Sequence, residues 1–404
     1  MKNNFASARR TTIQFVRISV LVSFLCAICV QSSPAQDFKI IRPGVEYARV
    51  DHKIGNDPVR INLLRLDLKK VRLDVHHAFD KAVGVEPTSA IAKRHNAIAA
   101  INAGFFRLDK SEFAGDPAGV MQIDHRLVSE SVNNRVAMAI FNKVGRTVVD
   151  FGHAKTQTWL SISPNFSSID INAINREPKN NEVAIYTPEF VRSPSTSWPV
   201  TEIVLDDCLH DCDKFALRET SGGSQIPTHG YVVALYGDKR SLLTDRLRAV
   251  LKETSTRPMI NSIIELQAGK KRRFDKAEDV TNGVSMLLRD GRIDVTWEQE
   301  KASKSFAEMR HPRTAVAKLK DGKFLMIAVD GRHPGVSVGM TLKELADYLL
   351  SIGATDAMNL DGGGSTTMFV GGKVVNVPSD KEGERKVSDA IVVTLRDRAR
   401  RASK

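Results

Sequence analysis

The hydrophobic positions along the chain predict short strands more often than helices. Apolar Val71, Leu73 and Val75 alternate with polar residues, which is the period of a half-buried strand. Continuous apolar runs occupy residues 98–101, 324–329 and 390–395. Each run is short enough for a buried strand, so we expect strands over all four segments.

One helix is well marked after residue 340. Thr341 and Glu344 have the spacing of a capping box, in which the two side chains bind opposing backbone N–H groups. The apolar residues at 342, 345, 346, 349 and 350 share one helical face, and Gly353 suits the end of the helix. Because few other helical patterns occur, the sequence predicts an α+β fold with a mixed or antiparallel β-sheet core and a few packed helices.

The middle of the chain has weaker periodicity. Residues 152–200 are richer in Ser, Asn and Pro than the flanking regions, and we expect long connections at 160–180 and 186–200. No internal repeat or low-complexity tract is evident. The function of residues 150–300 does not follow from these patterns.

The first 35 residues resemble a secretory leader. They begin with a positive segment without acidic residues, and their apolar run of thirteen residues is shorter than the roughly 20 needed to cross a bilayer. Ser33 and Ala35 are small residues where a signal peptidase would cut. An uncleaved anchor is the alternative. We expect a secreted or periplasmic protein without stable membrane insertion, made of a signal peptide at 1–35, one catalytic domain at 36–395 and a basic tail at 396–404.

The formal net charge of the chain is +12, and removal of the four positive charges of the leader leaves +8. A basic protein favours anionic partners. The charges are scattered, apart from residues 270–273 and the C-terminal tail, and no nucleic-acid-binding module accompanies them. We therefore expect no nucleic acid partner. The oligomeric state stays open.

Two cysteines lie outside the leader, Cys208 and Cys212, with three residues between them. In an oxidising compartment this spacing favours a small-loop disulfide. Free thiols and a metal site that includes the neighbouring acidic residues are the alternatives.

The segment with the strongest chemical signal runs from Asn359 to Met368. Three consecutive glycines, Gly362 to Gly364, follow a short apolar strand, so a ligand could approach backbone N–H groups closely. Asp361 stands at the end of the strand, where its carboxylate would be held rigidly, and Ser365 adds a hydroxyl. A tight structural turn is the alternative, but the polar residues on both sides favour function.

A second turn with a carboxylate and a guanidinium follows the strand 324–329. It contains Asp330, Gly331 and Arg332, and alone it would be an ordinary hairpin turn. Its significance rises because Asp361 occupies a similar turn 31 residues later, at the end of what should be a neighbouring strand. Arginine is well suited to bidentate phosphate contacts. Further basic groups occur in His311-Pro312-Arg313 and in Gly383-Glu384-Arg385.

A fifth candidate segment is distant in sequence. Asn102, Ala103 and Gly104 follow a buried strand and precede Phe105 and Phe106. The asparagine could bind sugar hydroxyls and an aromatic face could pack on a sugar ring, although a structural turn fits equally well. The chain has no Walker-type phosphate-binding loop and no His-Glu-x-x-His motif.

Taken together, these segments resemble the phosphodiester glycosidase family, whose eukaryotic members remove N-acetylglucosamine from a phosphodiester. The resemblance covers about residues 95–140 and, more firmly, 310–395. Ala103 stands where the family usually has a second glycine, and His311 where it often has Asn. The matching motifs, in chain order, are Asn-x-Gly-Phe-Phe at 102–106, Pro-Arg-Thr-Ala at 312–315, Asp-Gly-Arg at 330–332, Asn-Leu-Asp-Gly-Gly-Gly-Ser at 359–365, Pro-Ser at 378–379 and Gly-Glu-Arg at 383–385.

This resemblance implies an exported hydrolase that cleaves the glycosidic bond of a sugar-1-phosphodiester. Asp361 and Asp330 would stabilise an oxocarbenium-like transition state, and one of them would activate water. No cofactor is required, although a divalent cation shared by the two aspartates stays open. The residues that would bind substrate or phosphate are Asn102, Gly104, Arg313, Arg332, Asn359, Gly362, Gly363, Gly364, Ser365, Glu384 and Arg385.

Two other functions use the same residues. One is the remodelling of a phosphate-containing or acidic cell-envelope glycan or exopolysaccharide. The other is a non-catalytic protein that binds such a glycan. The presence of both Asp330 and Asp361 favours catalysis over binding alone.

Overall fold

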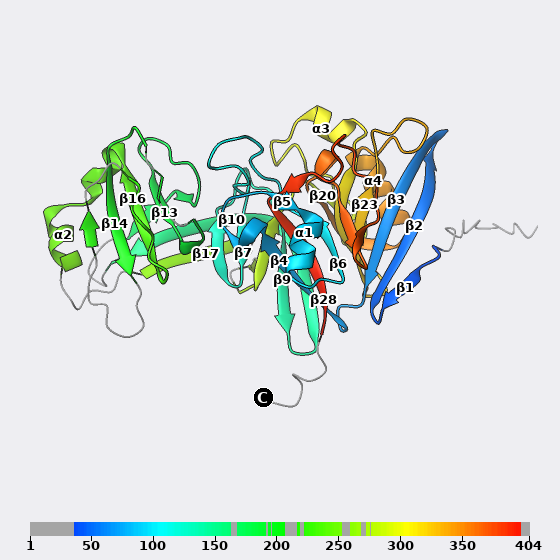
Figure 1. Ribbon diagram of the computed structural model, residues 1–404, viewed down its shortest axis with the longest axis horizontal. Helices are drawn as coiled ribbons and strands as arrows, with labels where there is room; N and C mark the ends of the chain where they lie inside the picture. Colours follow the sequence, from blue (N-terminus) through cyan, green and yellow to red (C-terminus); the bar gives the residue numbers. More distant parts are fainter. Residues whose placement is uncertain are drawn as a thin grey trace, which may run out of the picture. The chain divides into compact units, whose positions relative to one another are not determined.

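Strands from the two ends of the chain pair in one of the two eight-stranded sheets described. The computed structural model describes residues 36–162, 168–190, 193–194, 196–206, 216–218, 222–252, 259–267, 272–274 and 276–396, all within one compact unit. The first sheet is antiparallel, and Figure 1 shows the blue N-terminal strands β2 and β3 beside β23 from the C-terminal half. In spatial order its strands are β1 (Lys39–Arg42), β2 (Val45–Ile54), β3 (Asp57–Leu66), β23 (Phe324–Val329), β22 (Arg313–Leu319), β24 (Ala354–Asn359), β20 (Met286–Arg289) and β21 (Arg292–Ile293).

The position of the β23 strand between two hydrophobic cores explains why its sequence is continuously apolar. Phe324, Met326 and Ala328 point into one hydrophobic core, whereas the alternate residues Leu325 and Ile327 point into another. The second core also contains the apolar face of α4 (Leu342–Ser351). A strand covered on both faces buries every side chain, which confirms the sequence prediction for 324–329.

The α4 helix begins as predicted. The Thr341 hydroxyl accepts a hydrogen bond from Glu344 N at 3.0 Å, and the Glu344 carboxylate accepts one from Thr341 N at 2.9 Å. This capping box satisfies two N–H groups that the first helical turn leaves without partners.

A second sheet supplies the other wall of the first core. Its β28 strand (red in Figure 1) lies between β4 and β6, and places Ile391 and Val393 in that core. Its opposite face carries α1 (Thr88–Arg94) over Ala390 and Val392. The strands, in spatial order, are β26 (Lys373–Val374), β25 (Met368–Val370), β6 (Ala99–Asn102), β28 (Asp389–Leu395) and β4 (Val71–His77). Strands at 71–75, 98–101 and 390–395 are thus confirmed, with shifts of one or two residues at their ends.

The middle of the chain contains more strands than the sequence predicted. A third sheet runs β18 (Arg272–Arg273), β17 (Met259–Gln267), β10 (Arg146–Ser161), β9 (Val136–Lys143), β19 (Asp279–Asn282), β7 (Met121–Ile123) and β8 (Arg126–Ser129), and β11 (Ile169–Ile171) pairs with β10. A fourth sheet runs β12 (Ala173–Ile174), β13 (Val183–Tyr186), β16 (Gly230–Tyr236), β14 (Val200–Asp206) and β15 (Ala216–Arg218). The prediction of a long connection over 160–180 was wrong in part, because the short paired strands β11 and β12 lie within that segment.

Short elements complete the described structure. β5 (Glu86–Pro87) pairs with β27 (Lys386–Val387), and the remaining helices are α2 (Asp245–Lys252), α3 (Lys304–Glu308), η1 (Ala78–Asp80), η2 (Pro188–Phe190), η3 (Gly237–Leu242) and η4 (Gly363–Ser365). Among the residues described, no helix has both the length and the apolarity to cross a membrane. The predicted leader, 1–35, lies outside the described residues, as does the predicted tail, 396–404, except for Arg396. The assignment of 36–395 as one catalytic domain stays a prediction.

Candidate active site

The two acidic turns, which contain Asp330 and Asp361, lie at the same end of the strands of the first sheet. Arg313 at the start of β22 is opposite Val329 at the end of β23, and Ala315 is opposite Asn359 at the end of β24. Because β22 is antiparallel to both strands, the turns after Val329 and Asn359 emerge on the same side. The sequence placed these turns on neighbouring strands. This was wrong, since β22 lies between them.

Glycine allows the two turns to close on the segment between them. A Cβ at Gly331 would lie only 2.7 Å from Pro312 N, and a Cβ at Gly362 would lie 2.8 Å from Pro312 O. Gly363 N also donates a hydrogen bond of 2.9 Å to Pro312 O. Side chains at these glycines would force the turns apart, so their absence is a condition of the site geometry.

Arg332 extends from one turn to the other. Its guanidinium Nη2 lies 3.1 Å from the position that a Cβ would take on Gly363, and 3.4 Å from His311 Nδ1. The residue is exposed and has a φ of 62°, a left-handed conformation that costs a non-glycine residue about 1–2 kcal/mol. This strained backbone directs a solvent-accessible cation over the glycine turn.

The Asp361 carboxyl is the most enclosed acidic group of the turn. Burial raises its pKa to about 7, although hydrogen bonds from Ser365 and Gly362 and the positive charge of Arg385 act in the opposite direction. The residue as a whole remains partly exposed. At neutral pH the group is therefore divided between its acidic and basic forms, which suits proton transfer.

Arg385 covers the glycine turn from the other side. Its Nε and Nη2 donate to the two carboxylate oxygens of Asp380 at 2.7 and 3.0 Å, so the guanidinium plane is fixed. A Cβ on Gly364 would overlap both members of this ion pair. Next to it, the Glu384 carboxylate accepts hydrogen bonds from the N–H (2.7 Å) and the hydroxyl (2.6 Å) of Ser89 at the start of α1. Glu384 thus anchors the segment that carries Arg385.

Arg135 is a further basic group near the site. It lies close enough to Asp361 for that carboxylate to affect its pKa, which burial lowers overall, and its guanidinium carbon is 5.7 Å from the Phe105 ring centroid. Nη1 donates to Ala118 O, whereas Nε is buried without a hydrogen-bond partner. The sequence did not indicate this residue, because it is a single arginine after a turn and no motif surrounds it.

Asn102 and Gly104 hold the turn together. Asn102 Nδ2 donates to Asp361 O at 2.7 Å, and Asn102 Oδ1 accepts from Thr367 N at 3.0 Å. The Gly104 N–H donates to the buried Asp389 carboxylate. Asn102 therefore positions the Asp361 main chain, whereas the Gly104 N–H is bound to Asp389.

Arg313 and Asn359 are likewise committed to the fold. The Arg313 guanidinium is buried and donates to the carbonyl oxygens of Met340 (2.8 Å), Phe306 (2.7 Å) and Met309 (3.0 Å). Its pKa falls to about 10, chiefly through burial and also through the charge of Arg332. Asn359 Nδ2 donates to Val284 O at 3.1 Å and to Leu360 O at 2.8 Å, whereas its Oδ1 is buried without a hydrogen-bond partner. These side chains support the loops of the site.

Asp330 links its turn to the segment that leads to Arg385. Its Oδ1 accepts from Val377 N at 3.1 Å, and its side chain is almost fully buried, which raises its pKa. Oδ2 is buried without a partner. Asp330 and Asp361 therefore contact different groups. The Asp330 carboxylate positions neighbouring segments, whereas the Asp361 carboxyl lies at the glycine turn.

The glycine turn itself is not an open set of N–H groups, as the sequence suggested. Gly362 N donates to the Asp361 carboxyl and Gly363 N to Pro312 O, while Ser365 N reaches Gly362 O at 3.2 Å. Anion binding at this site therefore depends on guanidinium groups more than on backbone amides. The predicted pair Cys208 and Cys212 lies outside the described residues.

Fold and site together define a β-rich protein with a carboxyl of raised pKa among guanidinium groups, an arrangement suited to an anionic substrate. Residues 215–394 match the family model described as phosphodiester glycosidase. This match confirms the resemblance to the phosphodiester glycosidase family over this part of the chain.

Individual relatives share shorter segments or the fold alone. A prophage-derived uncharacterized protein of Bacillus subtilis, YomE, is 39% identical over 89 residues, which are 22% of this chain and 14% of that protein. Mouse N-acetylglucosamine-1-phosphodiester alpha-N-acetylglucosaminidase is 34% identical over 109 residues, 24% of this chain and 20% of the enzyme. The alignments thus span only about a fifth or less of these relatives. A hypothetical protein from Synechocystis has the same fold, with a TM-score of 0.71 at 23% identity over 90% of this chain and 64% of that one.

Proposed function

We propose that this protein hydrolyses the glycosidic bond of a sugar-1-phosphodiester. The observation that carries the proposal is the Asp361 carboxyl, with its pKa raised to about 7, beside Arg385 and near Arg135 and the turn of Arg332. A phosphodiester carries one negative charge, and arginine binds phosphate oxygens in bidentate geometry. The family match over 215–394 supports the same reaction class.

In this reaction Asp361 acts on water at the anomeric carbon. The ionised carboxylate takes a proton as the water oxygen bonds to that carbon, and the bond from the carbon to the phosphate oxygen breaks. The departing phosphate monoester keeps the electron pair of the broken bond. Because this leaving group is already stable, the arginines need only balance its charge, and the negative carboxylate also favours the oxocarbenium-like transition state.

Asp361→Asn is the direct test. The variant keeps the size of the side chain but removes the base, so the release of sugar from a panel of glycosyl phosphodiesters should fall about 100-fold or more. Asp356→Asn is the matched control, because Asp356 lies on the same β24 strand outside the turn. Unchanged turnover in a folded Asp361→Asn variant would remove Asp361 from the mechanism.

The same panel addresses substrate class. Diesters that differ in sugar identify the specificity of the site, and a purified phosphate-containing envelope glycan tests the polymeric alternative. Release of new reducing ends from the glycan, with no turnover of small diesters, would favour the remodelling function. Tight glycan binding without product would favour a binding protein.

Export forms part of the proposal. The positive segment and short apolar run at the N-terminus support cleavage after Ala35 and a secreted or periplasmic location. N-terminal sequencing of the protein recovered from outside the cytoplasm tests this. A mature chain that still begins at Met1 in the cytoplasmic fraction would contradict it.

A further inference from the structure

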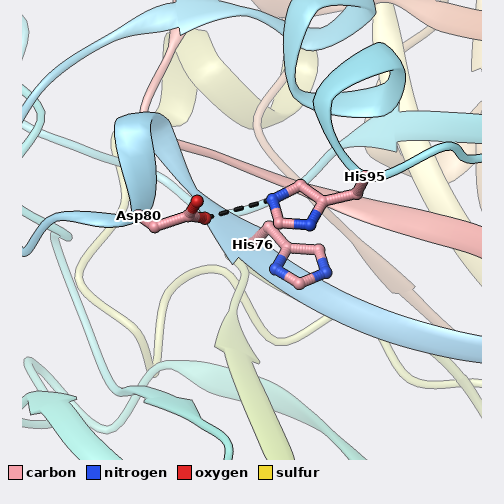
Figure 2. Close-up of side chains that lie close together, drawn as sticks. All are labelled: His76, Asp80 and His95. Atoms are coloured by element: carbon pink, nitrogen blue, oxygen red, sulfur yellow. Dashed lines mark hydrogen bonds and ion pairs between the residues drawn. The ribbon is translucent and has the colours of Figure 1, made fainter.

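Three potential metal ligands meet at the C-terminal end of α1. Glu384 contacts the other end of this helix. His76 is near the end of β4, Asp80 ends η1, and His95 follows α1 directly. Their ligand atoms all lie within 4.8 Å of one another, and Figure 2 shows the three side chains converging from separate elements. Among the residues that the structure describes, this is the single group of three or more His, Cys, Asp or Glu side chains with such geometry.

Asp80 and His95 already have the spacing of two ligands on one ion. His95 Nε2 lies 3.1 Å from Asp80 Oδ1. Zinc binds histidine nitrogen and carboxylate oxygen at about 2.0–2.2 Å in a tetrahedron, which places two ligand atoms about 3.3 Å apart. An ion could therefore replace this contact with little movement of either side chain.

The His76 imidazole is the third candidate ligand, and its side chain is partly exposed. The His76 and His95 rings stack at 3.4 Å between centroids with an angle of 8° between their planes. Imidazole lone pairs lie in the ring plane, so metal binding requires the His76 ring to turn out of this stack.

Arg94 contacts two of the three side chains. It makes ion pairs with Asp80 Oδ2 and with Glu86, and its Nη1 lies 2.8 Å from His95 Nε2, so a bound ion requires this guanidinium to move off that nitrogen. Two acidic residues, Asp124 and Glu189, also line the cavity beside the site. The pair to Asp80 Oδ2 leaves Oδ1 for the ion, and such outer contacts orient metal-binding carboxylates.

The strand pattern distinguishes His76 from its neighbour. His77 points to the opposite face of β4, where it is buried with Nε2 3.0 Å from Gly115 O. His76, Asp80 and His95 line a cavity of about 470 Å³, together with His77, Lys81 and Arg126. Three protein ligands leave a coordination position open to this cavity, where water or a small anion would complete the site.

We propose that His76, Asp80 and His95 bind a divalent transition-metal ion of the zinc type. The ion would join the end of β4, η1 and the end of α1. Glu384 holds the start of α1, and the ion would hold the other end of this helix. The ion would therefore stabilise the helix that supports the segment of Arg385. The proposal concerns metal binding and does not depend on glycosyl phosphodiester hydrolysis.

The test uses the full-length, tag-free protein after chelator treatment. Cobalt(II) should give visible absorption bands of a three- or four-ligand site with one equivalent bound, and zinc should displace it. Zinc should also raise the midpoint of thermal unfolding by about 5 °C, since it binds the folded form. Histidine side-chain NMR signals should shift as the ring stack opens.

Variants assign the site. His76→Gln and Asp80→Asn should each weaken cobalt binding at least about 100-fold, whereas the exposed His229→Ala should bind like the wild type. Cys208→Ala/Cys212→Ala should also leave binding intact, which separates this site from a cysteine site. His76→Gln changes one partly exposed side chain, so the fold should persist. The proposal is overturned if no cobalt spectrum appears, or if folded His76→Gln and Asp80→Asn bind as the wild type does.

Discussion

Arg385 lies directly over Gly364, so closely that a Cβ on the glycine would overlap its guanidinium and the Asp380 carboxylate. At this position glycine is therefore required by the close approach of a side chain. The same contact brings the positive charge of Arg385 to Asp361, where it opposes the effect of burial on the carboxyl pKa. This relationship leads to five testable predictions about the site.

Gly364→Ala should displace Arg385 and impair the enzyme. The added methyl group forces the Arg385–Asp380 pair away from the turn, and we expect KM to rise about 10-fold or more through loss of a charge-assisted contact. A double-mutant cycle with Arg385→Ala is the control, because the methyl group costs nothing extra once the guanidinium is gone. Additive effects would show that the two residues act independently.

Arg385→Gln should shift the pH dependence of activity. The wild-type rate should rise with pH through about 7, as Asp361 ionises, and then level off. Loss of the nearby cation removes a contribution that lowers the Asp361 pKa, so the midpoint should move upward by about 1 unit. Arg146→Gln, at an exposed position, serves as control. An unmoved midpoint would show that another group controls the profile.

Stability should have the opposite pH dependence to activity. The Asp361 carboxyl titrates near 4 when unfolded and near 7 when folded, so the folded form holds its proton more tightly. Wild-type stability from this group is complete below pH 4 and is lost as pH rises to 7. Asp361→Asn should therefore gain stability relative to wild type across this range, as measured by urea unfolding at pH 4, 5.5 and 8.

Asp116 offers a matched control for that measurement. Burial also raises its pKa to about 7, and one of its carboxylate oxygens is buried without a partner. Asp116→Asn should change the pH dependence of stability in the same direction as Asp361→Asn, yet leave turnover unchanged. Equal losses of activity in both variants would show that the effect of Asp361 is structural.

Arg332→Gly should separate binding from stability. Glycine accepts the φ of 62° without strain, so the free energy of unfolding should stay within about 1 kcal/mol of wild type. Loss of the guanidinium should raise KM by about 10–100-fold, as expected for a charged hydrogen bond. Arg146→Ala should leave KM unchanged. A wild-type KM in Arg332→Gly would exclude a phosphate contact.

Asp330→Asn should affect turnover much less than Asp361→Asn. An amide oxygen can still accept the hydrogen bond from Val377, so the turn should keep its position. We expect kcat to fall less than about 10-fold, against about 100-fold or more for Asp361→Asn. Equal losses in kcat, with normal thermal unfolding, would return Asp330 to a direct role in the reaction.

The sequence identified elements whose signals are short-range. The α4 helix was predicted because Thr341 and Glu344, three residues apart, determine its start. The β23 strand was predicted because six consecutive apolar residues suit burial on both faces. The β10 strand was missed, since its first half pairs with β9 and its second half with β17, and neither partner can be read from its own residues.

By itself, the sequence determined which segments carry chemistry: two acidic turns, scattered arginines and a family resemblance. Only the tertiary structure decided which side chains remain available. It engaged Asn102 and Arg313 with the backbone, brought Arg135 near Asp361, and joined His76 to His95. The physical reason is that burial and hydrogen-bond partners arise from strands and loops distant in sequence, and these partners determine whether a polar residue supports the fold or meets a ligand.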